Sequence, residues 1–386
     1  MEPVFIMSWN WEEKDWPNFR WNERKLAKAE ALFGEGAGIV IGASKHLDET
    51  ERRGLSIEIM SHEAVDTSAI EGERLDRDSV QSSIRRHLGM ATDHRRSSPA
   101  EAGIAEMMVD LYQHLPGALE EPVLMNWHRQ LMNGRTDFKD VGRYRTHDDP
   151  MQIVSGAIYE PKVHFEAPPS KQVGTEMARL MSWLEQSGPR GSTPLPPVTR
   201  AGIAHLWFES IHPFEDGNGR VGRAIIEKVL AQGLSAPIIT GMSGTLLKYR
   251  KAYYQALEDG SHGLEITDWL LWFATKAVEA QKYTLAQVEF IMNKSRLIDS
   301  LRGQLNPRQE KALLRLFAAG LDGFTGGLSA AKYMSITDAP PATATRDLNG
   351  LSDMGALVRT GERKSTRYHL NIPMGGIPAI RLSDIL

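Results

Sequence analysis

The chain has 386 residues and carries 45 Lys and Arg against 49 Asp and Glu, for a formal net charge of −4. Its 41% hydrophobic and 24% charged content excludes a fibrous or wholly disordered chain, and its mild acidity gives no general attraction to nucleic acid. The absence of cysteine excludes disulfides, thiolate metal sites and a cysteine nucleophile, and it fits a cytoplasmic protein. No segment has the pattern of a signal peptide or a membrane span, so we expect no membrane partner.

Changes in patterning along the chain suggest three parts. We expect an N-terminal helical domain over residues 1–95, a helical core over 96–300 and a C-terminal domain over 301–386. Four tryptophans open the chain, and we interpret them as core residues of a small cap, with a ligand-binding aromatic box as the alternative: Trp9, Trp11, Trp16 and Trp21.

Helical periodicity dominates the first 300 residues. Between Glu23 and Leu88 the residues are patterned as helices, with Gly72 ending one helix and Asp76 capping the next. The β-prone residues of 153–165 interrupt the helices and predict a hairpin with its turn at Glu160–Lys162. Further helices are predicted over 104–115, 122–132, 173–186, 198–210, 220–231, 246–258 and 266–294.

The residues after Gly303 predict a different pattern, in which three short helices precede a strand, a turn and a strand. This order is the outline of a winged helix-turn-helix. The predicted fold class is therefore mainly α, with one β-hairpin in the core and a C-terminal winged helix. The C-terminal segments are 307–317, 329–334 and 343–354 for the helices, 356–358 and 367–370 for the strands, and 361–364 for the turn.

The densest functional pattern is the segment from His212 to Arg223. Gly217–Gly219 can turn successive backbone N–H groups toward one point at the start of a helix, where the helix dipole favours an anion. Arg220 and Arg223 are three residues apart, so both guanidinium groups leave the same helix face. Two arginines above a nest of amides suit a polyphosphate better than a single carboxylate.

Two side chains at the start of this segment supply the remaining chemistry. Asp216 is a single hard oxygen ligand beside the nest, the usual protein share of a Mg²⁺ ion that phosphates also coordinate. His212 has an ordinary pKa near neutrality, about 6.5, and can therefore accept a proton. Together these residues predict phosphoryl or nucleotidyl transfer.

The same segment contains two patterns with other meanings. Gly217, Gly219 and Gly222 match G-x-G-x-x-G, but no strand precedes them and residues 234–247 hold no acid, so a dinucleotide site is rejected. An ordinary interhelical turn with solvated arginines is the structural alternative.

Residues His212 to Arg223 resemble the signature of the Fic (filamentation induced by cyclic AMP) family, H-x-F-x-[DE]-G-N-G-R-x-x-R. The segment Gly142–Arg145 is similar to a second family motif, and the resemblance extends over about 99–281, with further likeness in the first 90 residues. The eight specified positions of the signature are filled by His212, Phe214, Asp216, Gly217, Asn218, Gly219, Arg220 and Arg223.

The resemblance implies a helical core with a hairpin flap, and transfer of AMP from ATP to a Ser, Thr or Tyr hydroxyl of a target protein. It implies that His212 is the base, that Asp216 holds Mg²⁺ and that Tyr249 lies on the adenine side. It also implies that the target docks on the flap over 153–165, although a purely structural hairpin fits the sequence equally well, and that the chain forms a homodimer. The residues expected to bind ATP are Gly217, Asn218, Gly219, Arg220, Val221, Gly222, Arg223 and Tyr249.

Thr67, Glu71 and Gly72 resemble the family's inhibitory motif, [ST]-x-x-x-E-[GN]. Thr67 and Glu71 are four residues apart and share a helix face. The resemblance implies that Glu71 pairs with Arg223 and withholds that arginine from the outer phosphates of ATP. Without it, the two side chains would be interpreted as a solvated helix face. A related alternative is that Glu71 positions water to remove AMP, which would make the enzyme bifunctional.

The C-terminal domain supports a rival function. Basic residues over 305–372 could contact DNA phosphates, although winged helices also serve as docking modules. The alternative is therefore a DNA-binding regulator whose nucleotide site senses ATP. The basic residues are Arg346 on the predicted recognition helix and Arg359, Arg363, Lys364 and Arg367 on the wing.

Overall fold

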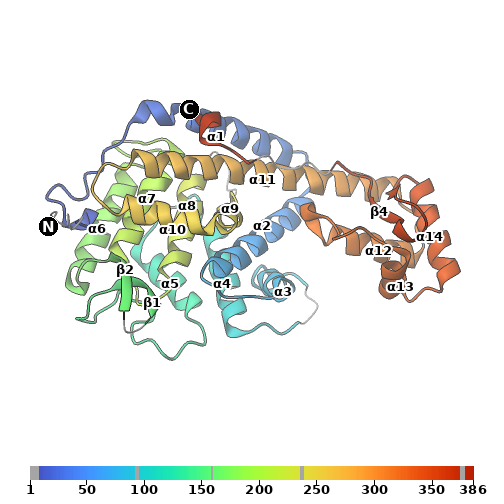
Figure 1. Cartoon of the computed structure of the whole chain (residues 1–386), viewed down its shortest axis with the longest axis horizontal. Helices are drawn as coiled ribbons and strands as arrows, with labels where there is room; N and C mark the ends of the chain where they lie inside the picture. The colour runs from blue at the N-terminus through green and yellow to red at the C-terminus, as the bar shows by residue number, and fades with distance from the viewer. Residues whose placement is uncertain (1–7, 92–94, 158–159, 235–238, 374–378) are drawn as a thin grey trace. The chain divides into compact units, whose positions relative to one another are not determined.

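Over its described residues, the computed structural model is mainly α-helical and contains two antiparallel strand pairs, which confirms the predicted helical class (Figure 1). Contacts within the chain divide it into two compact units. The described part of the first unit is 8–41, 56–91, 95–157, 160–234, 239–282 and 379–386, and that of the second is 42–55 and 283–373. Most of the predicted N-terminal region and most of the predicted core thus share one unit, whereas residues 42–55 belong to the second unit. The three-domain division stays a prediction.

The helices up to residue 300 and the first strand pair place the candidate site. The 3₁₀ helix η1 is Asn10–Glu12, and the strands are β1 (Gln152–Ala157) and β2 (Glu160–Glu166). The helices are α1 (Glu23–Ser44), α2 (Glu49–Ile70), α3 (Arg77–His87), α4 (Pro99–Gln113), α5 (Glu121–Leu131), α6 (Ser170–Gln186), α7 (Pro197–Ile211), α8 (Asn218–Gln232), α9 (Met242–Lys248), α10 (Arg250–Gly260) and α11 (Thr267–Ser300).

Helices α7 and α8 pack against each other in the core of the first unit (Figure 1). Both are buried on nearly every face, including Phe208 and Ile211 of α7 and Ile225 of α8. A helix that is buried on nearly every face occupies a core position, so its charged side chains, such as Arg223 and Glu227 of α8, need partners inside the protein. The loop that joins these two helices carries the sequence motif and is therefore held at both ends by rigid elements.

The N-terminal segment packs on the same unit through aromatic contacts. Trp16 is buried beside Trp207, and its indole nitrogen donates to Glu176 at 2.8 Å. Trp9 packs edge-on against Phe165 of β2. These contacts fit the interpretation of the tryptophans as packing residues.

Helix ends follow the predicted chemistry in the N-terminal region. Asp76 caps α3 by accepting a hydrogen bond from the backbone N–H of Ser79 at 2.9 Å, as expected. Gly72, which follows α2, has φ 87°, a conformation that favours glycine.

Two predicted features are wrong. The turn expected at Glu160–Lys162 belongs instead to β2, where Lys162 pairs with Ser155; the connecting residues 158–159 lie outside the described part of the chain. Proline has no backbone N–H, so it is tolerated in a strand at a sheet edge, where no hydrogen bond to a neighbouring strand is lost. Pro161 therefore does not end β2. The single helix expected over 246–258 is two helices, α9 and α10, which meet at Tyr249.

The second unit has its own core. Its helices and strands follow the predicted order, and Leu316, Tyr333 and Leu348 are buried together with Tyr368 of the last strand. This order agrees with the outline of a winged helix, whose assignment stays a prediction. The elements are α12 (Pro307–Phe317), η2 (Gly320–Asp322), α13 (Ala330–Thr337), α14 (Pro341–Asp353), β3 (Leu357–Thr360), η3 (Arg363–Ser365) and β4 (Arg367–Leu370), and α15 (Leu382–Ile385) follows in the first unit.

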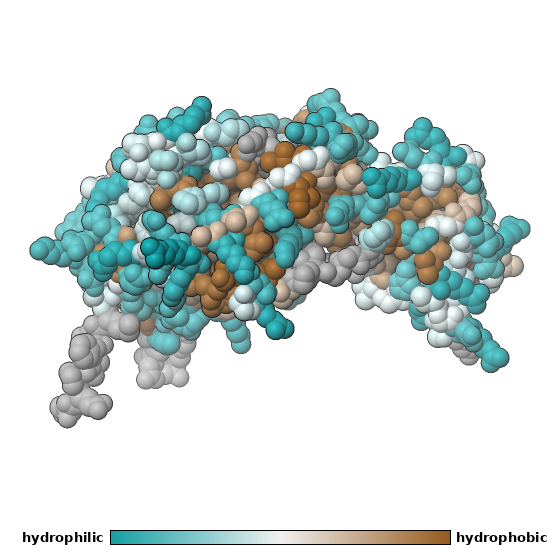
Figure 2. Space-filling view, turned by 90° about the horizontal axis from the view of Figure 1, so that it is seen from above, coloured by the Kyte–Doolittle hydropathy of each residue, from teal (hydrophilic) through white to brown (hydrophobic). Residues whose placement is uncertain are grey.

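The surface is largely hydrophilic on the face drawn in Figure 2, with smaller hydrophobic areas between the polar ones. Among the described residues, none of the helices combines the length and the apolar character needed to cross a bilayer.

Candidate active site

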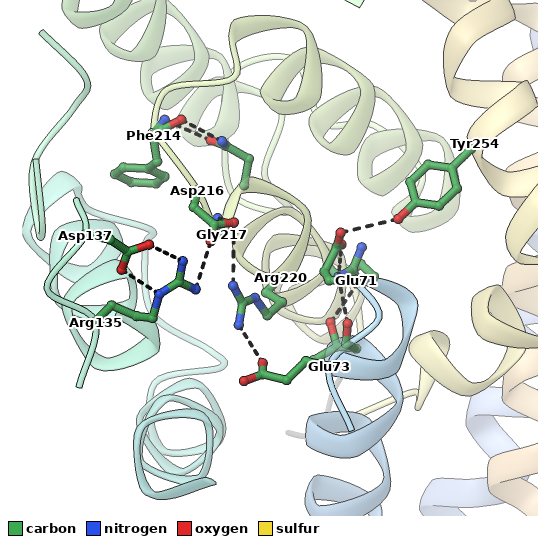
Figure 3. Close-up of polar contacts among 12 residues, drawn as sticks. Glu71, Glu73, Arg135, Asp137, Phe214, Asp216, Gly217, Arg220 and Tyr254 are labelled. Atoms are coloured by element: carbon green, nitrogen blue, oxygen red, sulfur yellow. Dashed lines mark hydrogen bonds and ion pairs between the residues drawn. The ribbon is translucent and has the colours of Figure 1, made fainter. Parts of the chain in front are cut away.

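The loop between α7 and α8 is closed by its own side chains. His212 follows α7 in a left-handed conformation (φ 49°, ψ 61°), which is uncommon for a residue other than glycine. The side-chain amide of Asn218 accepts from the backbone N–H of Phe214 at 2.9 Å and donates to its carbonyl at 2.8 Å (Figure 3). Because α8 begins at Asn218, the first N–H groups of α8 have no partner within the helix and can face an anion.

Arg145 holds the C-terminal end of α7 and the residue that follows it. Its buried guanidinium donates to the carbonyl oxygens of Ile211 at 3.3 Å and His212 at 2.9 Å. The same group donates to the carbonyl of Pro168 and to the hydroxyl of Ser170. Burial lowers the pKa of Arg145 to about 10, so the group stays charged at neutral pH. The predicted Gly142–Arg145 motif therefore positions His212 rather than touching a ligand.

Figure 3 shows a row of alternating charges beside the loop. The carboxylate of Glu73 accepts from Arg220 at 3.0 Å, and the other end of the Arg220 guanidinium lies 3.7 Å from Asp216. Asp216 in turn accepts from Arg135 at 3.4 Å, and Arg135 also pairs with Asp137 at 2.7 Å. Arg220 is therefore engaged by carboxylates on two sides.

Arg223 is buried, and two of its three guanidinium nitrogens, Nε and Nη2, bond to the segment that ends α2. Its Nε donates to the hydroxyl of Thr67 at 2.7 Å, and its Nη2 donates to the Thr67 carbonyl at 3.0 Å and to Glu71 at 2.6 Å. Burial raises the pKa of Glu71, but Arg223 outweighs it and holds that pKa below its ordinary value. The hydroxyl of Tyr254 donates to the second oxygen of Glu71 at 3.3 Å. A Cβ atom at Gly219 would clash with Glu71, so this glycine lets the carboxylate reach the start of α8.

His212 lies beside a second buried carboxyl group. Its Nδ1 lies 3.9 Å from Glu209, and only 12% of its side chain is exposed. Burial, followed by the charge of Arg145, lowers the pKa of His212 to about 4, so the imidazole is neutral at pH 7. Burial raises the pKa of Glu209 to about 8, and Nδ1 of His205 lies 4.0 Å from its other oxygen. Gly222 provides the room, because a Cβ atom there would clash with Glu209.

Asp216 fits the ligand role that the sequence predicts. It is the only carboxylate within the loop motif that stands beside the nest, and 37% of its side chain is exposed. The described residues hold no group of three or more acids and histidines that could bind a metal by themselves. A lone carboxylate suits Mg²⁺, which keeps water and substrate phosphates as its other ligands.

A cavity of about 1000 Å³ opens between the loop, the hairpin and α10. This volume falls at the upper end of the range for small-molecule sites, about 300–1,000 Å³. Its lining includes Glu71, Glu209, Ser210, His212, Gly219 and Arg223 on one side, the hairpin residues 152–155 together with His164 and Phe165, and Tyr253, Tyr254, Leu257 and Glu258 of α10.

The structure brings most of the predicted site residues together. His212, Gly219, Arg223 and Glu71 line the cavity, and Thr67 touches Arg223. Asp216, Gly217, Asn218 and Arg220 form the adjoining loop and the start of α8. Val221 is buried in the core, and Gly222 faces Glu209.

Tyr249 differs from this group. Its hydroxyl donates to Glu279 at 3.1 Å, Lys276 lies over its ring, and the described lining of the cavity does not include it. Tyr254, in contrast, is 40% exposed and lines the cavity. The tyrosine that bonds to Glu71 is therefore Tyr254 of α10 rather than Tyr249.

Sequence reasoning missed four functional candidates: Glu73, Arg135, Glu209 and Tyr254. Glu73 stands two residues after Glu71 in the sequence. The two acids of this segment bond to different arginines of α8, Glu71 to Arg223 and Glu73 to Arg220. Glu209 stands three residues before His212, a helical spacing that could have marked it. Arg135 gives no signal in the sequence, because its pairing with Asp216 joins positions 81 residues apart.

Comparisons with known proteins agree with the site. Residues 9–90 match a domain of unknown function (DUF4172), and residues 118–230 match the Fic/DOC family. The probable protein adenylyltransferase aq_aa38 of Aquifex aeolicus is 30% identical over 120 residues, which is 31% of each chain. Protein adenylyltransferase fic-1 of Caenorhabditis elegans is 26% identical over 140 residues, which is 36% of this chain and 24% of that one. The chain thus matches less than a third of either relative.

One solved structure matches most of the chain. A Fic family protein from Desulfovibrio desulfuricans G20 superposes with a TM-score of 0.50 at 24% identity, covering 89% of this chain and 95% of that one. At this identity the match establishes the fold. The motif and its geometry agree with the match of residues 118–230 to the Fic/DOC family.

Proposed function

We propose that this chain transfers AMP from ATP to a hydroxyl side chain of a target protein. The observation that carries the proposal is the convergence on one cavity of a neutral histidine, the N-terminal end of α8 and a buried arginine: His212, Gly219 and Arg223. The relatives named as protein adenylyltransferases support the same reaction.

The proposed step is an in-line displacement at the α-phosphorus of ATP. The target oxygen forms a bond to phosphorus, the bond to the β-phosphate oxygen breaks, and its electron pair leaves with pyrophosphate. Since Nδ1 of His212 faces Glu209, Nε2 is the nitrogen that accepts the hydroxyl proton. Arg145 fixes the position of this base through the main chain.

The phosphates are held by charge and by backbone amides. The free N–H groups at the start of α8 meet the α-phosphate, and Arg220 and Arg223 meet the outer phosphates. Asp216 would hold Mg²⁺, which would neutralise part of the phosphate charge. Positioning and charge stabilisation account for most of the rate in this class of reaction.

We further propose that Glu71 inhibits the enzyme. Its pairing with Arg223 at 2.6 Å removes that arginine from the phosphates, and its carboxylate lies against Gly219, where an anionic phosphate would have to sit. Glu73 pairs with Arg220 at 3.0 Å and likewise keeps that arginine from the phosphates. In the inhibited protein, the carboxylates of Glu71 and Glu73 therefore occupy the two arginines that would otherwise bind the phosphates of ATP.

The test is labelling of protein with ATP that carries the label on its α-phosphate. Glu71→Gly should raise labelling by roughly tenfold or more, because a brake of about 1.4 kcal/mol already slows a reaction tenfold. His212→Ala in the Glu71→Gly background should abolish labelling of the target protein, whereas Glu310→Gln, an exposed acid of α12, should have no effect. Intact-mass spectrometry identifies the transferred group. Unchanged labelling in Glu71→Gly would contradict the brake, and an adduct other than AMP would contradict the donor.

A second activity of the same site is removal of AMP. Glu71 lines the cavity with a carboxylate that can orient water toward a phosphodiester. The check is to incubate a purified AMP-modified target with wild-type protein and with Glu71→Gln. Release of AMP by the first and not by the second would support a bifunctional enzyme.

A DNA-binding role is supported by one observation on the second unit. Arg346 on α14 and Arg359 and Arg363 on the last hairpin are exposed. Asp347, which follows Arg346 on α14, is buried and pairs with Arg308 at 2.8 Å, so it does not offset the exposed positive charge. Exposed cations on a helix and a hairpin are the usual contacts to phosphate.

A further inference from the structure

The hairpin β1–β2 contains a bulge that singles out one histidine. Ile153 pairs with Phe165 and Val154 pairs with Val163. The backbone of His164, which lies between Val163 and Phe165, therefore has no pairing partner on β1. A bulge of this kind redirects a side chain, and bulges are common beside active sites. His164 thereby leaves the regular pattern of the strand and lines the cavity described above.

The redirected imidazole joins a hydroxyl to a carboxylate. Nε2 of His164 lies 2.6 Å from the hydroxyl oxygen of Ser155 on β1, and its Nδ1 lies 3.0 Å from Glu258 of α10. Since Glu258 accepts from Nδ1, Nε2 is left as the acceptor for the Ser155 proton. A nucleophile within hydrogen-bond reach of a base, which a third group orients, is the arrangement of an activated nucleophile.

This group shares the cavity with the transfer machinery. Ser155, His164 and Glu258 line the same space as His212 and Arg223. Ser155 is exposed, and about a quarter of each of the other two side chains is exposed, so the hydroxyl can meet a ligand. A hydrogen-bonded pair that served only to hold the hairpin on α10 would need His164 and Glu258 but not Ser155.

We propose that Ser155 is an AMP acceptor within the chain itself, with His164 as its base and Glu258 as the positioning residue. The proposal rests on the proposed function, because ATP bound in the cavity is the donor. The oxygen of Ser155 bonds to the α-phosphorus, and the bond to the β-phosphate oxygen breaks with its electron pair on pyrophosphate. The hydroxyl proton passes to Nε2 of His164, and the product is an AMP ester of Ser155.

The first experiment tests the activated hydroxyl without ATP. A fluorophosphonate probe reacts with an activated serine, which bonds to phosphorus while fluoride leaves with the bonding electrons. We expect the wild-type protein to be labelled on Ser155, and His164→Ala to react roughly 100-fold more slowly, the usual contribution of a general base. Glu258→Ala should also lose labelling. Glu258→Gln should restore it in part, because its amide oxygen still accepts from Nδ1.

Ser182 on α6 is the matched control. It is exposed and pairs with Gln186 rather than with a histidine, so it should not react with the probe. Equal labelling of Ser155 and Ser182, or full labelling of Ser155 in His164→Ala, would overturn the proposal.

The second experiment tests transfer. The Glu71→Gly protein is incubated with ATP and Mg²⁺, digested, and its peptides are mapped by mass spectrometry. We expect an AMP adduct on Ser155 that is absent from Glu71→Gly/Ser155→Ala and slowed by a further His164→Ala change. AMP on other hydroxyls but not on Ser155 would overturn this proposal and leave the proposed function standing. No AMP on any protein, with Ser155 still reactive toward the probe, would overturn the proposed function and this proposal with it.

Discussion

At the scale of single residues, the site pairs each motif arginine with a different carboxylate. Glu71 engages Arg223, which is almost wholly buried, and Glu73 engages Arg220. An arginine that already carries a charge-assisted hydrogen bond cannot make its full set of bonds to phosphate. Under the proposed function, binding of ATP would therefore displace two acids, both from the segment that follows α2.

Glu73→Gln tests the second of these pairs. We expect it to lower the KM for ATP by roughly two- to tenfold, because a partly exposed pair contributes about 0–1 kcal/mol. It should raise labelling less than Glu71→Gly does, because Glu71 also lies against Gly219 whereas Glu73 only pairs with Arg220. The measurement is AMP transfer at varied ATP concentration. Arg220→Ala would reveal the opposite loss of affinity. A Glu73→Gln protein with unchanged KM would mean that Arg220 is free to bind ATP in the resting state.

Glu209 predicts a pH dependence of stability. Burial holds its pKa at about 8, above the ordinary value of 4.5, so the folded state keeps a proton that the unfolded state loses. The free energy of unfolding then falls as the pH rises from about 4.5 to 8, at up to about 1.4 kcal/mol for each pH unit. Glu209→Gln removes this loss.

The melting temperatures of both proteins at pH 6 and pH 8 provide the measurement. We expect the wild-type protein to lose more than Glu209→Gln between the two values. Burial lowers the pKa of His212 to about 4 and that of His205 to about 3, so both histidines add stability as the unfolded chain loses their protons near pH 6.5. This gain is common to both proteins, and the difference between them reports on Glu209. Parallel changes in the two proteins would mean that Glu209 is ionised at pH 6.

At the scale of elements, buried carboxylates join α8 to the start of α9. Glu227 on α8 accepts from the backbone N–H groups of Thr240 at 2.6 Å and Met242 at 2.7 Å. Glu63 on α2 accepts from the backbone N–H and the hydroxyl of Ser243. Helix α2 precedes the proposed inhibitory residue Glu71, and α8 carries Arg220 and Arg223. Both helices thus form hydrogen bonds with the residues at the start of α9.

Glu227→Ala should destabilise this junction. It leaves two buried N–H groups without acceptors, and each should cost about 1–3 kcal/mol. Glu227→Gln keeps one acceptor oxygen and should cost less. Urea unfolding compares the three proteins, and a Glu227→Ala protein as stable as the wild type would show that water replaces the carboxylate.

At the scale of the whole molecule, the net charge of −4 conceals local concentrations of positive charge. The DNA-binding alternative therefore depends on the exposed arginines of the second unit. We expect the intact protein to shift a DNA duplex in a gel at low salt, and Arg346→Ala with Arg359→Ala to weaken the shift, with a shallower dependence on salt. A shift that both substitutions leave unchanged would exclude this surface.

The sequence by itself determined the helical class, the caps of several helices and the loop motif, because each depends on neighbours a few residues apart. Asp76 could be assigned as a cap in this way, and so could the arginine pair of α8. Local patterning could not place the hairpin turn, since Pro161 is tolerated within an edge strand. It also could not reveal that Tyr249 faces Glu279.

Only the tertiary structure decided which charges meet. The carboxylate of Glu73 reaches Arg220 across 147 positions, and Arg135 reaches Asp216 across 81. The bulge that brings His164 to Ser155 and Glu258 likewise depends on strand register and on the packing of α10. Such pairs follow from how distant elements pack together, a relation that residue type and local spacing do not encode.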